Sequence, residues 1–137
     1  MDMLILDFSK AVDKVPHERL MVKLKYHGVK DKTLEWITSW LTNRAQSTVV
    51  DGSISRIYKP VAVTSGVPQI TVLGPLMFLP YVNDIQEDLE CTLRLFAGDT
   101  LLYHRITCET DTITLQCDLD KLGSWAESWQ MVFNPVI

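Results

Sequence analysis

The stretch "LRLFAGDTLLYH", Leu93 to His104, decides the fold because it places two apolar runs on either side of a Gly-Asp pair. This pattern is typical of a β-hairpin that closes on a tight turn, and Gly98 suits the first position of a type II′ turn. Asp99 then lies at the tip of the hairpin. A single aspartate there serves either the chemistry of the turn or one half of a metal site, and the stretch alone leaves both open.

Strand-like and helical segments alternate around that hairpin. The patterns predict a buried strand over residues 3–8, a helix from Pro16 to a stop at Gly28, a helix over 32–44 capped by Asp31, a hairpin around Asp51-Gly52, a helix within 71–90 constrained by Gly74, Pro75 and Pro80, a helix over 109–130 and a last strand over 131–134. This order predicts an α+β chain with an antiparallel sheet and helices packed on one face.

Length and charge limit the classes of function. The chain has 137 residues, which suits one domain, and its formal net charge is −4, from 13 basic and 17 acidic residues. A free-standing nucleic-acid binder usually carries a basic surface, because contacts to phosphates supply most of its non-specific affinity. The acidic balance argues against tight autonomous binding, although it does not exclude a groove within a larger protein.

The cysteines and the apolar runs bear on the compartment. Cys91, Cys108 and Cys117 are odd in number and lack zinc-site spacing, so we expect reduced, mostly buried thiols. This composition favours an intracellular protein of the nucleus or cytoplasm that is not secreted. The longest apolar run, residues 72–82, is too short to cross a bilayer, and we expect no membrane segment.

Three motifs together point to a family. They are "LDFSKAVDKVPH" (Leu6–His17), "TSGVPQITVLGP" (Thr64–Pro75) and "FAGDT" (Phe96–Thr100). In order and in sequence they resemble the reverse transcriptase domain of non-LTR (LINE-type) retrotransposons, where the same places typically read "LDFSKAFDKVPH", "SGVPQGTVLGPLMF" and "FADDT". The resemblance extends through "YVNDI" and the "W…W…FN" pattern near the end, so residues 1–137 are interpreted as a partial reverse transcriptase domain.

The resemblance implies a polymerase palm, which extends a DNA primer on an RNA template with deoxynucleotides and two Mg²⁺ ions. Mg²⁺ prefers oxygen ligands, and two such ions stabilise the attacking and the leaving oxygen. Carried over to this sequence, Asp7 and Asp99 are the catalytic and metal-binding carboxylates, and the backbone carbonyl of Phe8 is a further metal ligand. Val12 and Gln69 are the substrate-binding positions.

The sequence departs from the family at the site itself. Gly98 occupies the place of the first hairpin aspartate, so one metal ligand is lost and Mg²⁺ binding is expected to be impaired. Val12 replaces a bulky aromatic residue, and Ile70 replaces the glycine that follows Gln69. Pro80 is expected to disturb its helix. Fingers and thumb are expected to be missing, because the chain starts just before Asp7 and stops at 135–137. We therefore expect a degenerate reverse transcriptase that is catalytically dead, with RNA template, DNA primer and nucleotide as partners of the family rather than of this fragment.

Two alternatives stay open beside that interpretation. Asp7 and Asp99 could hold one Mg²⁺ and support weak residual nucleotidyl transfer, or the chain could be a non-catalytic protein-interaction module. Exposed palm faces would also favour self-association. Arg44, Arg56 and Lys59 are either template contacts or ordinary strand charges. The histidines share no ligand spacing, and the tryptophans are expected to pack in the core or at an interface.

Overall fold

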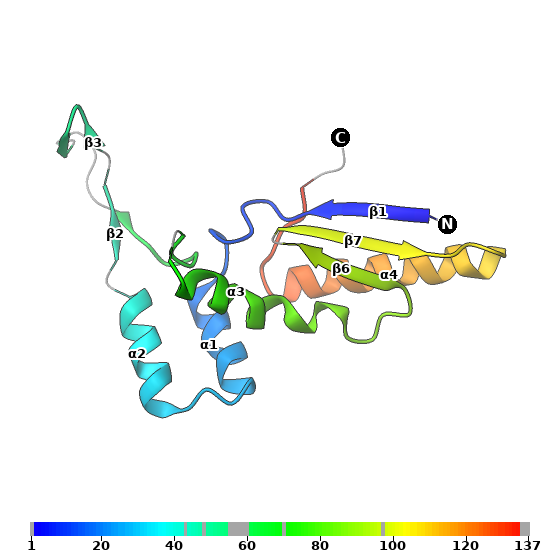
Figure 1. Cartoon of the computed structure of the whole chain (residues 1–137), viewed down its shortest axis with the longest axis horizontal. Helices are drawn as coiled ribbons and strands as arrows, with labels where there is room; N and C mark the ends of the chain where they lie inside the picture. Colours follow the sequence, from blue (N-terminus) through cyan, green and yellow to red (C-terminus); the bar gives the residue numbers. More distant parts are fainter. Residues whose placement is uncertain are drawn as a thin grey trace.

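The computed structural model of the chain describes residues 2–42, 44–47, 49–54, 61–69, 71–96 and 98–134. Its elements, in chain order, are β1 (Asp2–Asp7), α1 (His17–Tyr26), α2 (Asp31–Leu41), β2 (Ala45–Gln46), β3 (Val49–Val50), β4 (Ser53–Ile54), β5 (Val61–Ala62), α3 (Leu73–Val82), the 3₁₀ helix η1 (Asn83–Gln86), β6 (Thr92–Phe96), β7 (Asp99–His104) and α4 (Glu109–Ser128) (Figure 1). The predicted α+β order is confirmed as far as the end of α4.

The main sheet has three antiparallel strands in the order β1-β7-β6. The strands β6 and β7 are the two arms of the predicted hairpin, and Phe96 pairs with Asp99 where they meet. On its other side β7 pairs with β1, from Asp2 opposite His104 to Asp7 opposite Asp99. The first apolar run of the sequence and the hairpin, far apart along the chain, therefore lie side by side.

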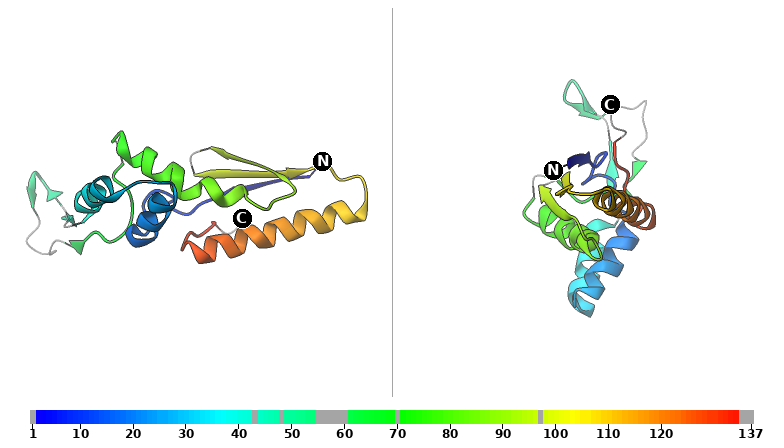
Figure 2. Two further views of the ribbon diagram at one scale, coloured as in Figure 1. Left: turned by 90° about the horizontal axis from the view of Figure 1, so that it is seen from below. Right: turned by 90° about the vertical axis from the view of Figure 1, so that its right-hand side faces the viewer.

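One face of this sheet is buried and the other is open, because successive side chains of a strand point to opposite faces. Leu93 and Leu102 are buried in the same cluster as Leu122 of α4, and α4 runs along this face (Figure 2). On the open face, Ile5 is 69% and Phe96 81% exposed. The predicted helix packing on one face is confirmed for α4.

The other helices gather beyond the end of the sheet at which β1 finishes (Figure 1). There α1 packs against both α2 and α3. The side chains of Leu20, Ile37 and Tyr81, one from each of these helices, are buried in the common core. The prediction that the helices share one face of the sheet is wrong for α1 and α2, because their apolar stripes are buried against other helices instead.

The second predicted hairpin is present and projects away from the helices (Figure 1). Its strands β3 and β4 pair Val50 with Ser53. Between them Asp51 and Gly52 have φ of 50° and 77°. Positive φ at both central residues is what a type I′ turn requires, and an Asp-Gly pair adopts it readily.

Two predicted details of the helix and strand ends are wrong. Asp31 does not cap α2 but is its first residue, and the N-cap, Lys30, makes no side-chain capping bond. Residues 131–134 do not form a strand, because the chain leaves α4 through Gln130 at a φ of 56° and pairs in a single isolated bridge, between Phe133 and Phe8, the residue that follows β1.

The helix α3 includes Pro80, which was expected from the sequence to disturb it. Proline has no N–H for the carbonyl one turn earlier, and it clashes with that turn in an ideal helix. The helix ends soon after, at Val82, and the chain continues as η1. The proline therefore does not prevent the helix, which continues two residues beyond it.

Exposure of the cysteines differs from the prediction. Cys91 is buried, while Cys108 and Cys117 are exposed. Burial raises the pKa of the Cys91 thiol to about 12. The expectation of mostly buried thiols is wrong, because Cys108 caps the exposed start of α4 and Cys117 lies on its solvent side. In the part of the chain that the structure describes, no helix combines the length and apolar character that crossing a membrane requires.

Candidate functional site

The two acidic residues predicted to act together, Asp7 and Asp99, lie opposite each other at one end of the sheet. Asp7 ends β1, Asp99 begins β7, and the two are direct partners across the strands. One position further, the Phe8 N–H donates to the Gly98 carbonyl at 3.0 Å. Asp7 and Asp99 therefore form a non-hydrogen-bonded pair, in which side chains of neighbouring strands come closest. Both side chains are exposed.

A side chain at position 98 would face the Asp7 carboxylate. A Cβ atom on Gly98 would lie 3.8 Å from Oδ1 of Asp7 and 3.4 Å from the Cβ of Ala11. These are ordinary contact distances, so the backbone has room for a larger residue there. Glycine supplies no side-chain oxygen at this position, and the predicted lost-ligand position thus lies beside the carboxylate of Asp7.

Gly98 has a different place in the turn from the predicted one. Because Phe96 pairs with Asp99, only Ala97 and Gly98 lie between the strands. The first loop position is therefore Ala97, and the predicted placement of Gly98 is wrong by one residue. Ala97 lies outside the described residues, so the type II′ turn itself stays a prediction.

The other predicted site residues border one cavity beside Gly98. This cavity, about 500 Å³ in volume, is lined by Phe8, Lys10, Ala11, Val12, Asp13, Pro68, Gln69, Pro75, Phe78, Leu79 and Gly98. Its wall is largely apolar. The structure thus brings Val12 and Gln69 together with position 98, and their role as substrate-binding residues stays a prediction. Ile70, which replaces the glycine that follows Gln69 in the family, lies outside the described residues.

Two glycines allow close backbone contacts in this region: Gly66 where residues 64–69 approach the loop that follows β1, and Gly74 where the start of α3 approaches Pro68. Gly66 has a φ of 86°, and its N–H donates to the Val15 carbonyl at 2.8 Å. At Gly74 a Cβ atom would overlap the Pro68 carbonyl oxygen. Positive φ and such close backbone approach both favour glycine. The amide of Gln69 then reaches Asp13 and donates to its Oδ1 at 2.6 Å.

Asn134 belongs to the site, although its role could not be assigned from the sequence. Its side-chain amide donates to Oδ2 of Asp7 at 2.6 Å, across 127 positions of sequence. The "FN" pattern marked the segment only as part of the family resemblance, and no local pattern could reveal so distant a contact. Asp13 is exposed, lies at the cavity and accepts a hydrogen bond from the Gln69 amide.

The residues at this end of the sheet do not fit a centre for two Mg²⁺ ions. Such ions need near-octahedral oxygen coordination, each usually from one or two carboxylates together with water and substrate phosphates, and the two ions of a pair lie close together. Asp7 and Asp99 supply two carboxylates, one oxygen of Asp7 is already bound by Asn134, and Gly98 supplies none. Within the described ranges there is no group of three or more His, Cys, Asp or Glu side chains suited to hold an ion.

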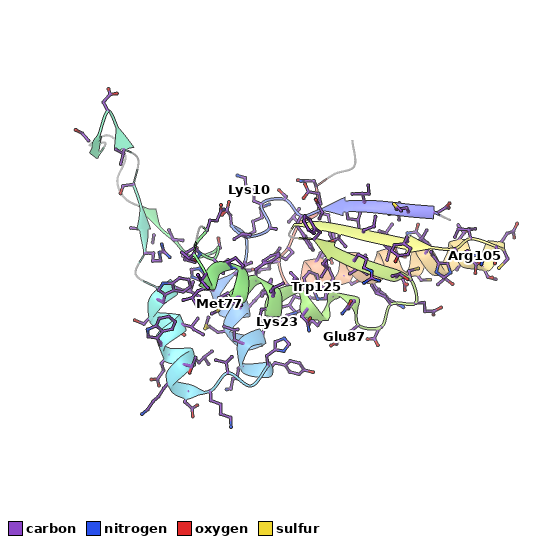
Figure 3. The ribbon with its side chains drawn as sticks, viewed as in Figure 1. Lys10, Lys23, Met77, Glu87, Arg105 and Trp125 are labelled. Carbon is purple, nitrogen blue, oxygen red and sulfur yellow. The ribbon has the colours of Figure 1, made fainter. Side chains whose placement is uncertain are left out.

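A buried ion pair joins the helices next to the site. Lys23 of α1 is 2% exposed, and its ammonium group binds Asp84 of η1. The same nitrogen lies over the rings of Tyr81, Trp125 and Trp129, 3.8 Å from the centroid of the last. Lys23 and Trp125 are labelled in Figure 3. Burial lowers the pKa of Lys23, and the hydrogen bond with Asp84 opposes this effect. Lys23 thereby ties α1 to α3, η1 and α4.

Similarity to known proteins extends over nearly the whole chain. Residues 3–136 match the family described as "Reverse transcriptase (RNA-dependent DNA polymerase)". The chain is 31% identical over 143 residues to the probable RNA-directed DNA polymerase from transposon X-element of Drosophila melanogaster, with 96% of this chain and 15% of that protein covered. It is 32% identical over 138 residues to the RNA-directed DNA polymerase from mobile element jockey of the same organism, with 94% and 15% covered. The chain thus spans about 15% of the length of these curated relatives.

Proposed function

The chain belongs to the reverse transcriptase family, and on that premise we propose that it is the palm of an RNA-directed DNA polymerase of the non-LTR retrotransposon type, degenerate at its metal site. The observation that carries the proposal is the position of Gly98. It lies next to Asp7, where a larger side chain has room, yet it offers no ligand.

The arrangement of the three motifs supports the palm assignment. The first motif ends β1 with Asp7, and the third forms the hairpin of β6 and β7, so that Asp99 becomes the partner of Asp7. The second motif contributes Gln69 to the cavity that reaches Gly98. Motifs far apart in the sequence thus meet at one place, as the sites of enzymes generally require.

Loss of the third carboxylate supports the proposal that polymerisation has been lost. Removing merely an outer partner of a metal ligand typically lowers metal affinity or activity by about 10–100-fold. Removal of a ligand itself is expected to cost more, because two divalent cations then share fewer negative charges. We therefore expect this chain to give no primer extension, while Asp7 and Asp99 persist on an intact scaffold.

A polar groove that carries two cationic side chains supports nucleic acid as the partner class of this fold. A groove of about 730 Å³ lies along residues 62–69, and the cationic Lys10 and Arg44 line it together with His17 and the acidic Asp13. Cationic groups in a groove favour contact with a phosphate backbone. Arg56 and Lys59, the other two basic residues weighed as template contacts, lie outside the described residues.

A second candidate function is a protein-interaction module, favoured by the open face of the sheet. Met3, Ile5 and Phe96 are 50%, 69% and 81% exposed there. Exposed apolar side chains on one face of a sheet favour association. Sedimentation velocity tests this candidate, because Ile5→Ser should then shift the chain toward monomer. A wild-type chain that is already monomeric at all concentrations would rule out self-association through this face.

The metal site tests the main proposal directly. Mn²⁺ binding, followed by electron paramagnetic resonance, should be at least about tenfold tighter in Gly98→Asp than in the wild type. Gly98→Asn has nearly the same volume without the charge, and should not bind more tightly than the wild type. Equal affinity of the Asp and Asn variants would overturn the site assignment. Primer extension by the wild-type chain on a homopolymer template, abolished by Asp7→Asn, would overturn the proposed inactivity.

A further inference from the structure

The segment that follows α4 returns to the end of β1 and is bound there by its backbone. We name residues 130–134 the strap. The Met131 N–H donates to the Ala126 carbonyl at 2.8 Å, which closes the end of α4. The Val132 carbonyl then accepts from the Ser9 N–H at 2.7 Å. These two bonds hold the strap on both sides without any contribution from a polar side chain.

Aromatic packing holds the strap independently. The rings of Phe133 and Phe8 are stacked, with centroids 4.4 Å apart and planes 17° apart. Phe8 is 3% exposed, and the centroid of its ring lies 6.1 Å from that of Trp125 in α4. Stacked rings of this kind attract each other beyond the effect of the area that they bury. Removal of one exposed polar side chain should therefore leave the strap in place.

Asn134 makes two separate bonds to Asp7. Its backbone N–H donates to the Asp7 carbonyl at 2.7 Å, and its side-chain Nδ2 donates to Oδ2 of the Asp7 carboxylate at 2.6 Å. An ionised carboxylate only accepts hydrogen bonds, so the amide must present its nitrogen and not its oxygen. The backbone bond docks the strap, while the side-chain bond acts on the carboxylate alone.

The side-chain bond determines which oxygen of Asp7 is available. Oδ2 is occupied by Asn134, and Oδ1 is the oxygen that lies 3.8 Å from where a Cβ of residue 98 would be. Without Asn134 the exposed carboxylate could rotate about its χ angles, since pairing with β7 restrains only the backbone of Asp7. With Asn134 it presents Oδ1 toward position 98.

We propose that Asn134 is a positioning residue that holds the Asp7 carboxylate in the rotamer in which Oδ1 faces position 98. The functional significance of this proposal rests on the proposed function, in which Asp7 is the remaining acidic residue of the metal site. Its physical content, a fixed rotamer, does not depend on any metal and can be measured separately.

Three-bond couplings of the Asp7 side chain, measured by NMR on the full chain without metal, test the rotamer. The wild type should show one χ1 rotamer, and Asn134→Ala should show averaging between rotamers. Val132→Ala is the matched control, because this strap side chain is 51% exposed and only its backbone carbonyl binds Ser9. Asn134→Asp keeps the volume but removes the donor, and should resemble Asn134→Ala.

Contacts between the Phe8 and Phe133 rings, followed by nuclear Overhauser effects, show whether the strap stays docked. A single Asp7 rotamer in Asn134→Ala with these contacts retained would overturn the proposal. Loss of the contacts in Asn134→Ala would also overturn it, because the side chain would then hold the strap rather than the carboxylate.

Measuring Mn²⁺ affinity adds a second test of the role of Asn134, and its outcomes can be told apart from a failure of the proposed function. In the Gly98→Asp background, Asn134→Ala should weaken Mn²⁺ binding by about 10–100-fold, the usual effect of losing a partner of a metal ligand. Failure of Gly98→Asp to bind Mn²⁺ would contradict the proposed function and leave the rotamer result standing. Unchanged Mn²⁺ affinity in the double variant would contradict the role of Asn134.

Discussion

Asp7 and Asp99 are direct cross-strand partners at the end of the sheet, and no third acidic side chain in the described ranges joins them in a metal-binding group. Like charges directly opposite each other in a sheet are destabilising. The pair is therefore a cost to the fold unless a cation lies between the two groups. A local arrangement that favours ligand binding at the expense of fold stability is typical of functional positions.

Neutralising one member of this pair should stabilise the chain. We expect Asp99→Asn to raise the free energy of unfolding by on the order of 0.5 kcal/mol in low salt, because the repulsion from Asp7 is removed. High salt should reduce the gain, since screening weakens interactions between exposed charges. Urea unfolding at two ionic strengths measures both effects. A destabilised variant would show that the pair is not repulsive.

Gly74→Ala should destabilise the chain although alanine usually favours helices. The new Cβ would overlap the Pro68 carbonyl oxygen, so the loop before α3 must move. We expect a loss of about 1–3 kcal/mol, as for other overpacked positions. Gly123→Ala in α4 is the control, because nothing lies within 4 Å of its Cβ position. That variant should gain about 0.4–1 kcal/mol, and thermal unfolding compares the two.

The two partners of the buried ion pair should differ in their importance. The side chain of Lys23 is 3% exposed and that of Asp84 is 24% exposed. Asp84→Asn leaves a fully buried ammonium without its anion and should cost about 3–5 kcal/mol. Lys23→Met should cost less stability, because the Asp84 carboxylate remains partly accessible to water and still accepts a hydrogen bond from the Trp125 indole N–H at 3.0 Å. Urea unfolding measures both, and a larger loss for Lys23→Met would contradict this ranking.

Asp118 should make the stability of the chain depend on pH. Burial acts to raise the pKa of its carboxyl, but the hydrogen bonds from the Cys91 N–H and Lys121 outweigh it, and the net result is a lowered pKa. The ionised group therefore stabilises the fold above the unfolded value of about 3.9, and this contribution is lost as the pH falls through the folded pKa. Protonation should release the loop at Cys91 from α4.

A comparison of the wild type with Asp118→Asn isolates this contribution. The difference in their free energies of unfolding should be on the order of 3 kcal/mol at about pH 6 and should shrink below about pH 4. Urea unfolding across this range measures the difference. A constant difference would show that the carboxylate charge plays no part.

Thr100→Val should stabilise the chain. Thr100 is 0% exposed, and its hydroxyl oxygen has no hydrogen-bond partner among the residues described. A buried polar group without a partner costs about 1–3 kcal/mol, and valine has the same shape. We expect a gain of about 1 kcal/mol, measured by thermal unfolding. Thr92→Val, on the exposed side of β6, is the control and should change stability by less than about 0.5 kcal/mol.

The hairpins and the longer helices could be predicted because their signals are local. Asp51 and Gly52 determine their own turn, and the spacing of Leu115 and Leu122 marks the buried side of α4. The cross-strand partnership of Asp7 with Asp99 followed only from the resemblance to a family. Nothing in either strand by itself specifies which strand it will pair with.

The wrong predictions concern contacts between distant segments. Residues 131–134 were predicted to form a strand because "MVFN" is mostly apolar. The chain beside them pairs with them at one position only, the bridge between Phe133 and Phe8, which is too short for a strand. The burial of Lys23 has no sequence signal, since lysine is almost never buried without a partner from elsewhere in the fold. The position of Gly98 in the turn was predicted wrongly by one residue, because the register of β6 and β7, and not the Gly-Asp pair, determines which residues form the loop.

The contact between Asp7 and Asn134 spans 127 positions, which is nearly the whole chain. Contacts of such separation form late, because the entropy of closing the loop must be offset by structure already in place. During synthesis Asp7 leaves the ribosome well before residue 134, and its carboxylate cannot be oriented until that residue has followed and the strap has docked. The acid at the end of β1 is therefore completed by the last residues that the structure describes, and any nascent or cleaved form that lacks them holds Asp7 with an unrestrained side chain.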